Sequence, residues 1–172
     1  MVMGCIANAC SPLAVSHAAS PPAAAPQAAP PVTALKNFYV DPFTGSGAIY
    51  LEALSRGASM ALALDVNANA IASLRKHLDT LNCGHGQLLQ SDALRYLETQ
   101  TPTAFDLVFL DPPFNKNLLQ PACELLETKG WLAEHAWVYT ESEAAPSTLG
   151  LPGNWRLHRE QKSGRVYYAL WQ

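Results

Sequence analysis

The stretch that decides the fold reads Phe38-Tyr-Val-Asp-Pro-Phe-Thr-Gly-Ser-Gly47. A short apolar strand leads here into a loop with two glycines, and a helical stretch follows directly. Because Gly45 and Gly47 have no Cβ atom, their backbone can approach a bound ligand closely. A tight strand-to-helix turn that binds nothing would have the same pattern, so the loop alone leaves both interpretations open.

Beyond this loop, apolar runs of strand length alternate with amphipathic helical runs. The expected strands are Phe38–Asp41, Met60–Asp65, Gly86–Gln90, Asp106–Leu110, Trp137–Thr140, Trp155–Glu160 and Val166–Trp171, and the expected helices are Gly47–Ser55, Ala68–Leu81, Ala93–Thr99 and Leu118–Thr128. Such alternation predicts a mostly parallel sheet with helices on both faces. The turn-like segment 161–165 predicts that the last two strands form an antiparallel hairpin. This combination is typical of a class I methyltransferase, a doubly wound, Rossmann-like α/β fold.

The 172 residues have room for one domain. Residues 1–35 contain no Asp, Glu, Lys or Arg, and prolines interrupt their alanine-rich stretch from Ser20 to Pro31. We expect residues 1–35 to form a disordered Ala/Pro-rich tail and residues 36–172 to form the domain.

The composition argues against several kinds of site. A net charge of −3 and a pI near 5.9 give no global basic field, so any contact with nucleic acid must be local. The four cysteines form no C-x-x-C pair, and no metal site is expected. No apolar run approaches the roughly 18 residues of a membrane span. We expect a cytoplasmic monomer without a membrane partner.

Asp65, at the end of the second expected strand, favours a cofactor that contains adenosine. It follows Gly47 by 18 residues, and a carboxylate placed there can accept hydrogen bonds from both ribose hydroxyls. A nicotinamide dinucleotide would also need a third glycine to clear space for its pyrophosphate, but Tyr50 occupies that position. S-adenosylmethionine has no phosphate, and it is therefore the predicted cofactor.

Neighbouring residues complete the predicted cofactor site. Asp92 can accept from the adenine amino group or cap the next helix, and both roles stay open. Asp41 can pair with the methionine ammonium group or orient the glycine loop. The predicted cofactor-binding residues are Asp41, Phe43, Gly45, Ser46, Gly47, Asp65, Val66, Asp92 and Ala93.

A second motif, Asp111-Pro-Pro-Phe114, ends the buried strand that begins near Phe105. Asp111 and the carbonyl of Pro112 can accept hydrogen bonds from an exocyclic amine, while Phe114 stacks on the ring and Pro113 stiffens the loop. Methyl transfer from a sulfonium needs alignment more than a strong base. These four residues are the predicted catalytic residues, although a proline-stiffened loop with a satisfied aspartate would look similar.

Four segments resemble the bacterial 16S rRNA (guanine(966)-N(2))-methyltransferases. They are Asp41-Pro-Phe-Thr-Gly-Ser-Gly-Ala48, Leu51-Glu-Ala-Leu-Ser-Arg-Gly-Ala58, Asp106-Leu-Val-Phe-Leu-Asp-Pro-Pro-Phe114 and Asn154-Trp-Arg-Leu-His-Arg-Glu160. The resemblance implies S-adenosylmethionine at residues 45–47, Asp65 and Asp92, and the guanine N2 amine of small-subunit rRNA at residues 111–114. Members of that family carry a basic hairpin and helix before the first strand, which residues 1–35 do not match.

Two other functions stay open at this stage. One is a catalytically silent relative that only binds the cofactor or packs as a scaffold. The other is an adenine-N6 DNA methyltransferase, which would usually need a target-recognition region for which this chain has no room. The basic residues of the last hairpin, Arg156, Arg159, Lys162 and Arg165, fit either phosphate contact or a solvated face. Lys116 and Asn117 are placed to meet a flipped nucleotide.

Overall fold

The computed structural model describes residues 38–172. The expected tail, residues 1–35, lies outside the described residues. The elements are, in chain order, β1 Phe38–Asp41, α1 Ala48–Ser55, β2 Met60–Asp65, α2 Ala68–Leu81, β3 Gly86–Gln90, α3 Ala93–Thr99, β4 Phe105–Leu110, α4 Leu119–Thr128, β5 Leu132–Ser142, the 3-10 turn η2 Pro146–Thr148, β6 Leu157–Ser163 and β7 Val166–Trp171.

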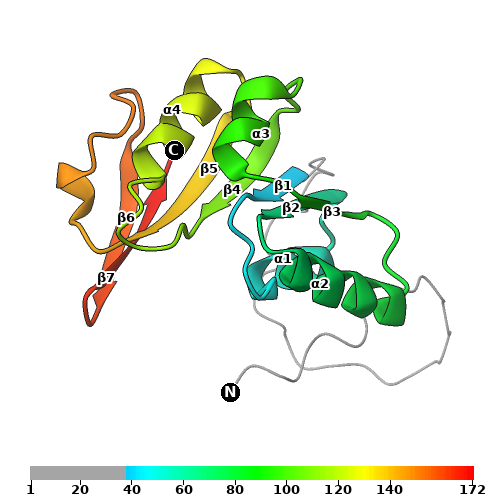
Figure 1. Ribbon diagram of the computed structural model, residues 1–172. Coiled ribbons are helices and arrows are strands. Elements are labelled where there is room, and N and C mark those ends of the chain that lie inside the picture. Colours follow the sequence, from blue (N-terminus) through cyan, green and yellow to red (C-terminus); the bar gives the residue numbers. More distant parts are fainter. Residues whose placement is uncertain (1–37) are drawn as a thin grey trace, which may run out of the picture.

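The seven strands form one sheet in the order β3-β2-β1-β4-β5-β7-β6 (Figure 1). The first five strands pair in parallel, whereas β7 pairs antiparallel with both β5 and β6. The chain reverses direction across the sheet between β1 and β4, which is the point where doubly wound sheets bind ligands. The predicted fold class is confirmed: the chain has a mostly parallel class I methyltransferase sheet that ends in an antiparallel hairpin.

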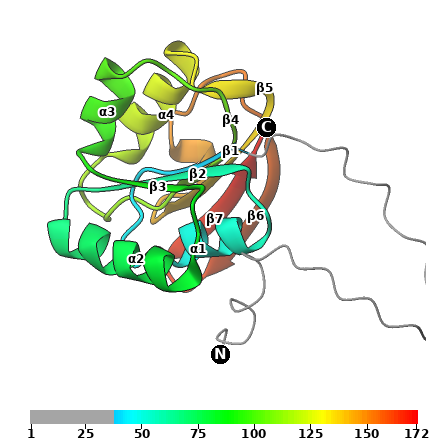
Figure 2. The same ribbon diagram turned by 90° about the vertical axis from the view of Figure 1, so that its right-hand side faces the viewer.

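Helices lie on both sides of the sheet (Figures 1 and 2). On one side, α1 packs against β1 and β2, and α2 packs against β2 and β3. Their core includes the buried residues Tyr50, Leu74 and Leu88. On the other side, α3 and α4 cover a larger core that contains Val108 and Trp131. The two cores hold the strands, and therefore the loops at their carboxyl ends, in fixed relative positions.

One part of the sheet is bare in the described region. The face that α1 and α2 cover at β1–β3 carries no described helix at β4, β5, β7 and β6 (Figures 1 and 2). Here Phe109 packs edge to face on Tyr139, and the ring of Tyr139 stacks on Tyr168, with centroids 6.0 and 6.5 Å apart. All three residues are half-buried. The expected cover by helices on both faces is therefore complete only over β1–β3.

Most of the expected boundaries agree with the structure, and the largest difference is in β5. The sequence predicts this strand over Trp137–Thr140, but it runs over Leu132–Ser142. Its first part pairs Leu132 with Phe105, and the register shifts before the pair Leu107↔Trp137. Strand β6 also differs slightly, since it covers Leu157–Ser163 instead of Trp155–Glu160 and extends into the segment expected to be the turn.

Candidate functional site

A cavity of about 670 Å³ opens at the carboxyl ends of β1, β2, β3 and β4. It is lined by Asp41, Pro42, Phe43, Thr44, Gly45, Ser46, Ala48, Ile49, Asp65, Val66, Ser91, Asp92, Ala93, Asp111, Pro112, Pro113, Phe114, Lys116 and Leu118. Every predicted cofactor-binding and catalytic residue except Gly47 is in this set. The structure therefore brings residues from four separate loops together around one space, and its size lies in the range of small-molecule sites.

The glycine loop has the backbone geometry that its sequence suggested. Gly45 and Gly47 have positive φ angles of 51° and 75°, which L side chains rarely adopt. Gly47 is the N-cap of α1 and faces the core, where an added Cβ would lie 2.1 Å from a methyl carbon of Leu74. Gly45 instead lines the cavity. The two glycines thus differ in position: one meets the open space, and the other allows α1 to pack on α2.

Asp65 joins the glycine loop to the end of β2. Its Oδ2 accepts a hydrogen bond from the backbone N–H of Gly45 at 2.9 Å, and its Oδ1 accepts one from the N–H of Asn67 at 2.7 Å. Each carboxylate oxygen has two lone-pair sites, so both can accept a second donor from the cavity. Asp65 can hold a ligand diol while it fixes the loop on which the rest of the ligand would lie.

Asp92 acts as a helix cap and also borders the cavity. One of its carboxylate oxygens, Oδ1, accepts from the backbone N–H of Arg95 at 2.8 Å, which satisfies one free donor at the start of α3. The neighbouring Ser91 donates its hydroxyl to the carbonyl of Asp92, and its own N–H donates to the carbonyl of Asp65. The capping role is therefore present, and Asp92 also lines the cavity together with Ala93.

Asp41 is the most buried acid of the site, with only 5% of its surface exposed. Burial raises the pKa of Asp41 to about 7, and the negative charges of Asp111 and Asp65 also raise it. An ionised carboxylate in such a place is costly unless a positive charge is near. Asp41 is accordingly suited to receive a cationic group such as an ammonium or a sulfonium.

The Asp111-Pro-Pro-Phe114 loop forms the opposite wall. Pro112 is buried, whereas Asp111 and Phe114 are exposed, and 39% of the surface of Phe114 is accessible. Burial of part of the carboxyl group raises the pKa of Asp111. After Phe114 the backbone turns sharply, with positive φ angles at Asn115 and Asn117, and the intervening Lys116 returns to line the cavity.

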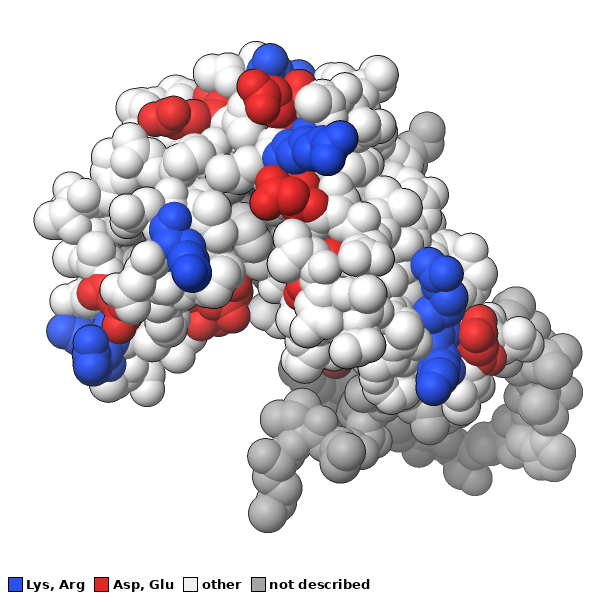
Figure 3. Space-filling model, viewed as in Figure 1, with Lys and Arg blue, Asp and Glu red and all other residues white. Residues whose placement is uncertain are grey.

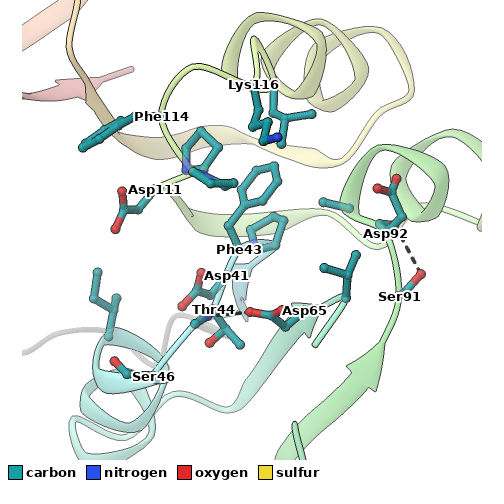
Figure 4. Close-up of a pocket in the computed structure, with 18 of the residues that line it drawn as sticks. Asp41, Phe43, Thr44, Ser46, Asp65, Ser91, Asp92, Asp111, Phe114 and Lys116 are labelled. Atoms are coloured by element: carbon teal, nitrogen blue, oxygen red, sulfur yellow. Dashed lines mark hydrogen bonds between the residues drawn. The ribbon is translucent and has the colours of Figure 1, made fainter. Parts of the chain in front are cut away.

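The close-up in Figure 4 shows how these groups divide the cavity. Asp65, Ser91 and Asp92 lie on one side, Asp111 and Phe114 lie on the other, and Asp41 and Phe43 lie between them. The first side has acceptors for hydroxyl and amino groups. The second side has an acceptor next to an exposed aromatic ring, which can hold a flat amine. The arrangement can hold two ligands whose reacting atoms meet near Asp41.

Sequence reasoning missed several residues that line the cavity, namely Pro42, Thr44, Ala48, Ile49 and Leu118. Four of them lie inside or directly after the glycine loop, so their closeness to the predicted residues was the only signal. Leu118 precedes α4, and it reaches the cavity because the loop folds back at Asn115 and Asn117.

Residues 38–172 contain no group of three or more His, Cys, Asp or Glu side chains that could hold a metal ion. None of the helices in the same range is long and apolar enough to cross a membrane.

Comparisons with known proteins agree on one family. A family model described as "Conserved hypothetical protein 95" matches residues 30–172. The Ribosomal RNA small subunit methyltransferase D of Escherichia coli is 43% identical over 133 residues, which are 77% of this chain and 67% of that protein. The protein of the same name from Haemophilus influenzae is 39% identical over 136 residues, which are 77% of this chain and 70% of that protein.

A solved structure named "Putative methyltransferase yhhF from Escherichia coli" superposes with a TM-score of 0.75 at 42% identity and covers 80% of this chain and 76% of that one. The family model takes in the whole sheet and every residue of the cavity. This agreement confirms the resemblance that the glycine loop and the Asp-Pro-Pro-Phe motif indicated. The chain therefore belongs to the ribosomal RNA small subunit methyltransferase D family.

Proposed function

We propose that this protein transfers a methyl group from S-adenosylmethionine to the exocyclic N2 amine of a guanine in the 16S rRNA of the small ribosomal subunit. The observation that carries the proposal is the division of one cavity between Asp65 and Asp92 on one side and Asp111 and Phe114 on the other, with Asp41 between them (Figure 4).

The described residues fit S-adenosylmethionine. Asp65 has lone pairs free for the two ribose hydroxyls, and Val66 presents an exposed apolar side chain, with 65% of its surface accessible, on which adenine can pack. Ser91, Asp92 and Ala93 border the adenine end. The buried carboxyl group of Asp41 can pair with the methionine ammonium, which removes the cost of its ionisation. The glycine loop keeps the space between these groups free of side chains.

The chain's own residues orient the acceptor. When bound, S-adenosylmethionine supplies an electrophilic methyl carbon, and the electrons of its C–S bond return to sulfur as the nitrogen lone pair forms the new N–C bond. Asp111 and the Pro112 carbonyl accept from the two amine hydrogens, which turns the nitrogen lone pair out of conjugation with the ring. Phe114 holds the ring by stacking. Asp111, whose pKa is raised by burial, can take the proton that the methylated nitrogen then loses.

The rRNA substrate is proposed from the relatives and the character of the site. The two curated relatives described above are both named as small-subunit rRNA methyltransferases. The acceptor side is open enough for a flipped base, because both Asp111 and Phe114 are exposed. Lys116 stands at the same rim and can contact a backbone phosphate.

The proposal is tested with labelled S-adenosylmethionine and small ribosomal subunits from cells that lack the modification, followed by mapping of the methylated nucleotide. We expect one N2-methylguanine in 16S rRNA. Asp111→Ala should abolish most of the transfer while cofactor affinity, measured by calorimetry, stays close to that of the unchanged chain. Full turnover by Asp111→Ala, or label on another base or atom, would contradict the proposal.

A further inference from the structure

A carboxylate outside the cavity lies beside Asp111 on the bare face of the sheet. Strands β4 and β5 pair in parallel with Phe109 opposite Tyr139 and Leu110 opposite Thr140. Leu110 and Thr140 are both fully buried on the α3 and α4 side. Since side chains alternate along a strand, the next residues, Asp111 and Glu141, project together from the bare face.

Glu141 is held in place by its neighbours. The hydroxyl of Tyr139 donates to Oε1 of Glu141 at 2.8 Å, and across the sheet Glu141 pairs with Tyr168 of β7. Glu141 is half-buried, and its burial, together with the negative charge of Asp111, raises its pKa. The strand register places the two carboxylates near each other, and the effect of the Asp111 charge on the pKa of Glu141 agrees with this placement. The Tyr139 bond leaves Oε2 and the remaining lone pairs of the carboxylate available for another donor.

Aromatic rings border this pair of acids. Phe109, Tyr139 and Tyr168 form a half-buried row of contacting rings below the two carboxylates. In Figure 3 the surface is hollowed between the part formed by β6 and β7 and the part formed by α1 and α2. Two adjacent acceptors beside flat rings in a hollow suit a planar group with two adjacent donors.

The Watson–Crick edge of guanine is such a group. Its N1–H and N2 amine are neighbouring donors, whereas adenine carries an acceptor at N1. We infer, on the basis of the proposed function, that Glu141 is a specificity residue that accepts the N1–H of the target guanine while Asp111 accepts from its N2 amine. An adenine in the same place would direct its N1 lone pair at the Glu141 carboxylate, and a buried acceptor without a donor is strongly disfavoured.

The first test compares two Glu→Gln substitutions near the carboxyl end of β5. Glu141→Gln should lower kcat/KM for guanine-containing subunits at least tenfold, with unchanged affinity for S-adenosylmethionine. Glu143→Gln is the matched control, because Glu143 lies two residues further on and pairs with Arg165 at 3.3 Å instead. It should keep the full rate. Equal rates for Glu141→Gln and the unchanged chain would overturn the inference.

The second test replaces the N1–H donor of the target guanine by an acceptor. 2-Aminopurine keeps the N2 amine but has an acceptor at N1, so it is placed at the mapped nucleotide in reconstituted subunits. The unchanged chain should methylate it at least tenfold more slowly than guanine. Glu141→Gln should reduce or invert that preference, because Tyr139 can hold the amide oxygen and leave the NH₂ group facing N1. An unaltered preference in this variant would contradict a contact between Glu141 and N1.

The two tests separate this inference from the proposed function. Failure of the unchanged chain to methylate any guanine would contradict the proposed function, and the inference would fall with it. Methylation of guanine by the unchanged chain, together with unchanged selectivity in Glu141→Gln, would contradict the inference alone. Melting temperatures and cofactor affinity of both glutamine variants show whether the fold and cavity are intact.

Discussion

The carboxyl group of Asp41 is buried, although the proposed function requires it to carry a negative charge. It is 5% exposed, and burial raises its pKa to about 7, from an ordinary value of 3.8. The folded chain therefore holds a proton that the unfolded chain has already released across this pH range. The contribution of Asp41 to the free energy of unfolding is therefore greatest below pH 4, and it is lost as the pH rises toward 7. A bound cation would restore part of that loss.

Asp41→Asn should therefore stabilise the empty protein at neutral pH. An amide carries no charge to desolvate, and we expect a gain in the free energy of unfolding on the order of 2 to 4 kcal/mol at pH 7 to 8. The gain should vanish near pH 4, and affinity for S-adenosylmethionine should fall because the ammonium loses its partner. Urea unfolding of both proteins at several pH values measures this. A gain that does not depend on pH would contradict a raised pKa for Asp41.

Asp65→Ala should weaken S-adenosylmethionine binding by roughly 1 to 3 kcal/mol, because ribose hydroxyls would lose a charged acceptor. The same change removes the acceptor of the Gly45 and Asn67 backbone N–H groups, so the glycine loop should also loosen. Calorimetry gives the affinity, and Glu98→Ala, on an exposed position of α3, is the control. Undiminished affinity in Asp65→Ala would remove Asp65 from the binding site.

The elements that the sequence predicted to the residue carry strong local signals. Helix α2 begins after Asn67, whose side chain accepts from two backbone N–H groups of its first turn, and ends at Asn82 in a left-handed conformation. The Asp-Pro-Phe-Thr-Gly-Ser-Gly loop and the Asp-Pro-Pro-Phe loop were found because glycine permits backbone conformations that other residues rarely adopt, whereas proline fixes φ. Fourteen residues of α2 could therefore be bounded without knowledge of the rest of the fold.

The elements that the sequence missed depend on distant partners. The first residues of β5 include the exposed polar pair Glu134 and His135, which interrupts the apolar pattern, yet the strand continues there because Leu132 pairs with Phe105. Its far end is polar too, and it is a strand because Glu141 and Ser142 pair with Tyr168 and Tyr167 of β7. Glu141 was missed for this reason: only the sheet register brings it beside Asp111.

Gly47→Ala tests whether the loop-to-helix junction needs glycine. The backbone at Gly47 has φ 75°, and an added Cβ would lie 2.1 Å from a methyl carbon of Leu74, which is in the core. We expect a loss of roughly 1 to 3 kcal/mol in the free energy of unfolding. Gly57→Ala is an informative control, because Gly57 has φ 87° but no atom within 4 Å of an added Cβ. We expect Gly57→Ala to lose less free energy of unfolding, and this loss gives the cost of the backbone conformation alone. Equal losses in the two variants would mean that the Leu74 side chain moves aside at no cost.

At the scale of the whole molecule, the proposed function depends on surfaces that the fold creates but the sequence does not show. The sequence predicted the sheet and most of the cavity, since their residues lie in recognisable loops. It could not predict the bare face of β4, β5 and β7, because that face exists only where α1 and α2 stop covering the sheet (Figures 1 and 2). The Asp111-Pro-Pro-Phe114 loop, which we propose to be catalytic, lies at the border between this face and the cavity, so an incoming base would meet both.

The charge of the molecule sets how RNA can be held on that face. The net charge is −3, and on the face shown in Figure 3 the Lys and Arg side chains are scattered rather than gathered into one patch. Phosphate contacts must then come from single side chains in the right places. Arg159 of β6 pairs with Leu170 of β7, and Leu170 pairs with Tyr139 of β5. Since paired residues share a face, Arg159 lies on the bare face. It belongs to the same cross-strand row as Tyr139, which is two residues before Glu141 on β5.

We therefore expect Arg159→Ala to weaken binding of the small subunit in a salt-dependent way. Loss of one phosphate contact should reduce the slope of log affinity against log salt by about 0.7 to 0.9. Affinities are measured between 50 and 200 mM salt for this variant and for Lys129→Ala, a control at the end of α4 on the opposite side of the sheet. The control should keep the slope of the unchanged chain. Equal slopes of log affinity against log salt for all three proteins would contradict the prediction. They would show that RNA does not reach the Asp111-Pro-Pro-Phe114 loop across the bare face.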